Sequence, residues 1–170
     1  MMDEVSLLID LLDNNWSSSA TTLQSAGTIS SDHIGKPNII DIRSMEANRG
    51  SRYDLSLKDL IVIFEDSQTV DYPTVHYDVR NESYSFTIHI RHVQDERAGT
   101  DADFGKDRLR ALYLITRHVL EGKRTGYTAS DGSRFNQIFV GARSESNDRK
   151  KRIFGYKISI EVKRFALSVP

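Results

Sequence analysis

Two stretches of this sequence alternate between apolar and polar residues, and this alternation constrains the fold more than any other feature. The first runs from Tyr84 to Arg91 and the second from Phe154 to Lys163. Successive side chains of a strand point to opposite faces of the sheet, so each stretch predicts a strand with one buried face. The polar residues of the second stretch form its expected solvent face: Lys157, Ser159, Glu161 and Lys163.

A different periodicity, typical of an amphipathic helix, covers the residues from Lys106 to Glu121. Its apolar stripe recurs every three or four positions and consists of Leu109, Leu112, Ile115, Thr116, Val119 and Leu120. Such a stripe predicts a helix that packs on the sheet. Gly122 is placed to end it, and Asp103 is placed to cap its start.

The first 36 residues divide into two parts of different character. Residues 3–13 show a short amphipathic pattern with acidic residues in the first turn, where the helix dipole favours anions. We expect this helix to end at Asn14 and Asn15. Residues 16–36 are rich in Ser, Thr, Gly and Asn, which predicts a long loop or a flexible arm.

Three further apolar stretches predict additional strands, at residues 37–43, 57–64 and 135–142. Residues 66–73 are expected to form a turn, and the strand pattern after Val75 is interrupted near Asn81 and Glu82. The last two strands are expected to form a hairpin whose charged tip spans residues 144–151. The element order predicts one α+β domain over residues 1–170, with a mostly antiparallel mixed sheet, an N-terminal helix, one long helix packed on the sheet and a closing C-terminal hairpin.

Composition narrows the possible classes of protein. The 170 residues include no cysteine, so disulfides and thiolate metal sites are excluded. A formal net charge of −1 gives no overall attraction to nucleic acid or to an anionic membrane. The apolar runs are too short to cross a bilayer, and the acidic N-terminus is unlike a secretory signal. We therefore expect a soluble protein of a reducing compartment.

The sequence contains no convincing catalytic constellation, so we expect no catalytic, cofactor-binding or metal-binding residue and a protein that is not an enzyme. It has neither a nucleophile elbow nor a phosphate-binding glycine loop. His89 and His92 are the only close pair of histidines, and their spacing in a strand points them to opposite faces. The alternative is a metal-dependent nuclease, in which Glu161 and Lys163 form a Glu-x-Lys motif and Asp78 or Glu82 supplies the distant carboxylate.

Two groups of basic residues are candidates for contact with a subunit or partner. One lies at the expected hairpin tip and consists of Arg149, Lys150, Lys151 and Arg152. The other flanks the apolar stripe of the long helix and includes Arg108, Arg110 and Arg117. An acidic protein surface is one possible partner, and DNA phosphate is the alternative. If DNA phosphate is the partner, the chain is a nucleic-acid-binding module.

The order of elements from Asp3 to Val162 resembles that of the tail terminator (tail-completion) proteins of tailed bacteriophages and archaeal tailed viruses. The resemblance is carried by residues 84–91, which lead through a polar loop into residues 107–113, and by the final strand at residues 156–162. It covers most of the chain and lies in pattern and order.

The resemblance implies a structural protein of the virion, made in the host cytoplasm and located in the tail or neck. Such proteins form a ring, commonly hexameric, that caps the tail tube and joins it to the head-side connector. The implied partners are therefore other copies of the chain, the tail tube protein and a connector or neck protein, with DNA passing through the ring lumen and no membrane. Another neck, connector or tail-tube protein is the closest alternative role.

Overall fold

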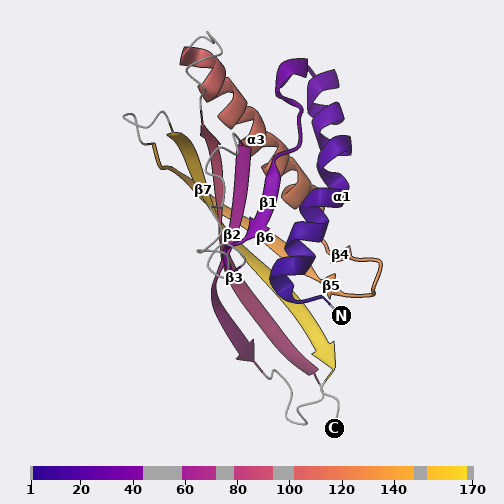
Figure 1. Cartoon of the computed structure of the whole chain (residues 1–170). Helices are drawn as coiled ribbons and strands as arrows, with labels where there is room; N and C mark the ends of the chain where they lie inside the picture. The colour runs from indigo at the N-terminus through magenta and orange to yellow at the C-terminus, as the bar shows by residue number, and fades with distance from the viewer. Residues whose placement is uncertain (1, 44–58, 72–78, 94–101, 148–152, 168–170) are drawn as a thin grey trace.

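Five strands form one mixed sheet, and two helices lie against one of its faces (Figure 1). The computed structural model describes residues 2–43, 59–71, 79–93, 102–147 and 153–167. The strand order is β1-β2-β3-β7-β6, with β1 parallel to β2 and all other neighbours antiparallel. The bounds are β1 Asn38–Asp41, β2 Asp59–Asp71, β3 Val79–Val93, β6 Gln137–Glu145 and β7 Ile153–Leu167. The predicted α+β class is confirmed.

The N-terminal helix α1 spans Glu4–Ser25 and is twice as long as the sequence pattern predicted. Asp3 caps it by accepting a hydrogen bond from the backbone N–H of Ser6 at 2.7 Å. The helix passes through Asn14 and Asn15 without a break, so the predicted end at these residues is wrong. The predicted loop or flexible arm at residues 16–36 is wrong for residues 16–25, which are helical.

The second half of α1 is helical because its buried stripe continues. Leu12, Trp16 and Ala20 follow one another at intervals of four residues, and each is at most 2% exposed. The Trp16 indole N–H also donates to the carbonyl of Ile34 at 3.3 Å, which ties the following segment to the helix. Gly27, whose φ of 70° suits glycine, directs the chain away from the helix. Residues 26–36 then pack through Ile29 and His33, including the short 3₁₀ helix η1 at Ser31–His33.

The long helix α3 spans Ala102–Gly122, and its predicted apolar stripe is buried. Asp103 lies in its first turn and not at the cap position. α3 packs against α1 and against β3, β6 and β7. The predicted long helix on the sheet is therefore confirmed.

The strands are longer than the sequence indicated. β2 continues to Asp71 through much of the predicted turn at residues 66–73, and β3 runs unbroken through Asn81 and Glu82. Near the predicted strand at residues 135–142, the chain forms β5 (Arg134–Phe135), which pairs with β4 (Tyr127–Thr128), and then β6. β6 and β7 pair antiparallel, while the residues of the expected tip from 148 to 151 lie outside the described ranges.

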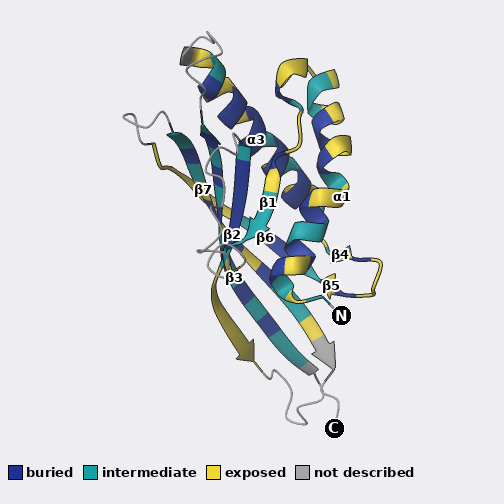
Figure 2. Cartoon of the chain, viewed as in Figure 1, coloured by how far each residue is buried: buried dark blue, intermediate teal, exposed yellow. Residues whose placement is uncertain are grey.

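Buried residues alternate with less buried ones along β3 (Figure 2), so the two faces of the sheet differ in burial. On the face toward α1 and α3, the core contains strand residues Ile61, Ile63, Tyr84, Phe86, Ile88, Ile90, Ile158, Ile160 and Val162. The other face, here called the helix-free face, carries the alternate residues, including the predicted solvent face of β7. Of its β7 residues, Lys157, Ser159 and Glu161 are exposed and Lys163 is half-buried. No helix in the described ranges is both long and apolar enough to span a membrane.

Candidate functional site

Arg108, predicted to contact a partner, is buried at 5% exposure between β2 and the segment that contains His33 and Gly35. Its guanidinium donates to the Asp59 carboxylate at 2.7 Å and 3.0 Å and to the backbone carbonyl of Gly35 at 2.7 Å. A further bond goes to the carbonyl of His33. Arg108 therefore joins α3, β2 and the segment before β1, and it does not offer the exposed charge that a partner contact needs. The partner-contact prediction is wrong for Arg108.

The Asp59 carboxylate is the acceptor at the centre of this cluster. Its second oxygen lies 2.7 Å from Nδ1 of His92, which is itself buried. Burial alone would raise the pKa of Asp59, but the hydrogen bonds from His92 and Arg108 lower it below its ordinary value. We name Asp59, His92 and Arg108 the clamp. Because the donors and acceptors of the clamp bond to one another inside the molecule, we infer that the clamp stabilises the fold.

The other predicted basic residues lie elsewhere. Arg110 is exposed on α3. Arg117 is also exposed, and its guanidinium donates to Glu121 at 2.6 Å and to the Tyr113 hydroxyl at 2.8 Å. Arg149, Lys150, Lys151 and Arg152 lie outside the described residues. Arg110 and Arg117 remain accessible to a partner.

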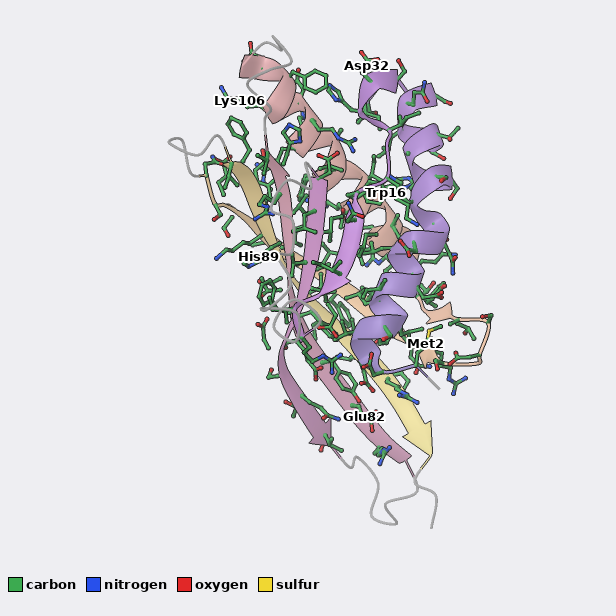
Figure 3. All side chains as sticks on the ribbon, in the orientation of Figure 1. Met2, Trp16, Asp32, Glu82, His89 and Lys106 are labelled. Atoms are coloured by element: carbon green, nitrogen blue, oxygen red, sulfur yellow. The ribbon has the colours of Figure 1, made fainter. Side chains whose placement is uncertain are left out.

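His89 and His92 lie on opposite faces of β3, as their spacing predicted. His92 belongs to the clamp, whereas His89 lies on the helix-free face (Figure 3). Two ligands on opposite faces of one sheet cannot share a metal ion. In the described part of the chain, no three His, Asp or Glu residues converge on a possible metal position.

The geometry also bears on the alternative nuclease site. Glu161 and Lys163 do share a face, with Oε1 and Nζ 3.8 Å apart. Glu82 lies on the opposite face, 4% exposed, where it accepts from the Tyr84 hydroxyl at 2.9 Å and pairs with Arg80. Glu82 therefore cannot join Glu161 at one metal ion. Asp78, the other proposed acid, lies outside the described residues.

The sheet has two unlike edges that no described strand covers. β1 pairs with β2 only as far as Ile63, so the outer edge of β2 is unpaired from Phe64 to Asp71 among the described residues. Residues 65–71 are all exposed, include three carboxylates and no base, and carry the apolar side chain of Val70 at 40% exposure. We name residues 64–71 the acidic edge.

β6 forms the other edge and differs in chemistry. Phe139 is 46% exposed on the helix-free face, with Nζ of Lys163 5.3 Å from its ring centroid. Beside it, Glu121, Arg124, Ile138 and Val140 complete a hollow of about 200 Å³. A bulge at Gly141 shifts the register against β7 there, and a Cβ at Gly141 would lie 2.8 Å from the carbonyl of Ser159. We name residues 137–145 and this hollow the Phe139 edge.

No family model matches this sequence, and no curated protein is significantly similar to it.

The sequence reasoning missed the clamp and both edges. Asp59 and Arg108 are 49 positions apart, so no local pattern connects them. The acidic edge is visible in the sequence as a pattern of charge. Glu65, Asp66 and Asp71 follow the apolar run of β2, and no basic residue lies among them. The segment at residues 66–73 instead predicts a turn.

Proposed function

We propose that this chain is a structural subunit of a tailed virion, specifically a tail terminator. In this role it self-associates into a ring that caps the tail tube and joins it to the head-side connector, with DNA passing through the lumen. We propose no catalytic activity for the chain. The observation that supports the proposal best is the pair of unlike edges that no described strand pairs with, one along β2 beyond the end of β1 and the other along β6.

Unpaired strand edges present free backbone N–H and C=O groups, and proteins normally cover or protect them. Two different edges on one subunit suit a heterologous contact, in which one surface meets another surface of the next copy. Such a contact, repeated from copy to copy, gives a ring when the rotation between neighbours closes and an open filament when it does not. The same arrangement would also suit another ring-forming neck or tail-tube protein.

The chemistry of the two edges is compatible with contact between copies. The acidic edge carries Glu65, Asp66 and Asp71, and the hollow of the Phe139 edge contains Arg124 beside Glu121. Val70 supplies an exposed apolar side chain on the first edge, as Phe139 does on the second. Opposite charges set the register of such a contact, and the apolar side chains become buried.

The test is the mass of the purified protein by light scattering across a concentration series. We expect a discrete species near six times the chain mass, or a monomer that converts to it as concentration rises. Negative-stain electron microscopy of that species should show rings with a central channel. A protein that stays monomeric at every concentration contradicts the proposal.

Two lysine substitutions test which surfaces form the contact. Val70→Lys and Phe139→Lys each place a charge at one edge, so each should shift assembly to at least tenfold higher concentration, about 1.4 kcal/mol per contact. Thr21→Lys, on the exposed side of α1, is the matched control and should assemble like the unmodified chain. Assembly unchanged in both edge variants would show that a ring, if formed, uses other surfaces.

A further inference from the structure

A pocket of about 230 Å³ opens on the helix-free face of the sheet, where it meets the start of the acidic edge at Phe64. Its apolar wall includes Leu60, Val62, Phe64 and Ile153. Leu60 and Val62 are 3% and 7% exposed, although neither belongs to the core beneath the helices. We name this site the helix-free pocket.

Positive charge surrounds this apolar wall. Arg91 and His89 come from β3, and Lys157 comes from β7, where it is the direct cross-strand neighbour of His89. The His89 ring lies against Phe64, with ring centroids 4.4 Å apart. Burial lowers the pKa of His89, and the charge of Lys157 lowers it further. At neutral pH the fixed charges of the pocket are therefore Arg91 and Lys157.

Arg91 is the feature that most needs an explanation. Its Nε atom is shielded from solvent and has no hydrogen-bond partner, and the guanidinium forms no ion pair within the described ranges. Burial lowers the pKa of Arg91, although a guanidinium remains charged at neutral pH. A half-buried donor without an acceptor costs stability. A ligand that supplies the acceptor would offset this cost.

We propose that the helix-free pocket binds an acidic side chain of a partner protein, together with a neighbouring apolar side chain of the same segment. A carboxylate is the acceptor whose two oxygens match the planar guanidinium of Arg91. Leu60, Val62 and Phe64 then contact the apolar side chain, and Lys157 supports the negative charge from the rim.

The size of the pocket indicates a protein segment and not a free metabolite. Small-molecule pockets commonly measure about 300–1,000 Å³, which is larger than this one. A volume of about 230 Å³ holds one or two side chains. This inference does not rest on the proposed ring, because the pocket belongs to one chain and shares only Phe64 of its lining with the acidic edge.

The experiment uses two peptides that differ only in charge, Ac-Leu-Glu-Leu-NH₂ and Ac-Leu-Gln-Leu-NH₂. Each is titrated into the full chain while the methyl NMR signals of Leu60 and Val62 are followed. We expect the Glu peptide to shift both signals and to bind at least about tenfold more tightly than the Gln peptide. In Arg91→Met this preference should disappear, while Arg110→Met, which removes an exposed arginine of α3, should retain it.

Arg91→Lys keeps the charge but loses the planar fork, so it should keep only part of the preference. Equal binding of the two peptides, or no shift of Leu60 and Val62 at millimolar concentration, overturns the proposal. Hexanoate that binds as tightly as the Glu peptide would indicate a small-molecule site and would also overturn it. A lower oligomeric mass in Arg91→Met would also overturn the proposal, because the pocket would then be occupied by a second copy of this chain.

Discussion

Each face of the sheet carries a buried or half-buried arginine, and the two arginines differ in their hydrogen bonding. On the helix-covered face, Arg108 donates to Asp59 and to two backbone carbonyls, all inside the molecule. On the helix-free face, Arg91 lines an apolar pocket and has no acceptor among the described residues. Arg108 therefore stabilises the fold, whereas the guanidinium of Arg91 can still donate a hydrogen bond to a partner from another molecule. This contrast distinguishes residues that maintain the structure from residues available to a partner.

The same contrast holds for the phenylalanines. Phe86 is fully buried beneath the helices, and Phe139 is 46% exposed at the Phe139 edge. Both are strand residues of the same chemistry, so their substitution by alanine compares the two environments directly. A buried aromatic side chain supports the core, whereas an exposed one offers area to another molecule.

The largest effect is expected from Phe86→Ala. Loss of a buried phenylalanine and the cavity it leaves cost about 3–5 kcal/mol of unfolding free energy. Phe139→Ala in the monomer should change that free energy by no more than about 0.5 kcal/mol. Urea denaturation followed by circular dichroism, at a concentration where the chain is monomeric, measures both. Similar losses in the two variants would mean that Phe139 is covered in the isolated chain.

A smaller but distinct loss is expected from Arg108→Met. This substitution removes the main cation from Asp59 and the donor from the carbonyls of His33 and Gly35. Removing one partner of a fully buried pair costs about 3–5 kcal/mol, and the 21% exposure of the Asp59 side chain reduces this to about 2–3 kcal/mol. Arg110→Met, on the same helix but exposed, is the control and should leave the unfolding free energy unchanged. Equal stability of both variants would contradict the structural role of the clamp.

The clamp should also be visible in the pH dependence of stability. Because the pKa of Asp59 is lower in the folded chain, its contribution is present above the unfolded pKa of about 3.9 and is lost as pH falls through the folded pKa. The stability difference between the unmodified chain and Asp59→Asn should therefore shrink below about pH 4. Urea denaturation at several pH values measures this difference. A difference that stays constant to pH 2 would show that Asp59 is not the titrating group.

The sequence predicted the helix-covered face far better than the rest. Strict alternation in β3 and β7 identified the buried strand residues, and the helical stripe from Leu109 to Leu120 identified the residues that cover them. The error in α1 has a specific cause. Its Ser- and Thr-rich second half has weak helix propensity, and the spacing of Trp16 and Ala20 after Leu12 outweighs that propensity through burial.

The candidate sites could not be predicted to the same extent because they depend on contacts between distant segments. The run from Leu60 to Phe64 is apolar at every position, which indicated burial but not that three of its residues would line a pocket on the helix-free face. In the sequence, Arg108 and Arg91 look alike, because each is next to one apolar residue, Leu109 or Ile90. Only the fold shows that Asp59 reaches the first, and that no described acceptor reaches the second.

The smallest expected effect is also the most informative about the helix-free face. Arg91→Met replaces a half-buried guanidinium, which has no partner among the described residues, with an apolar side chain of similar length. A fully buried unsatisfied group costs about 1–3 kcal/mol, so partial burial predicts a gain in unfolding free energy of about 0.5–1 kcal/mol. Thermal and urea unfolding measure this gain, with Lys157→Met as the comparison, since Lys157 is exposed and its loss should leave stability unchanged. A loss of stability in Arg91→Met would mean that the guanidinium already has a partner within the chain. A gain in stability, together with loss of the preference for the Glu peptide, would show that Arg91 destabilises the free chain and contributes to binding.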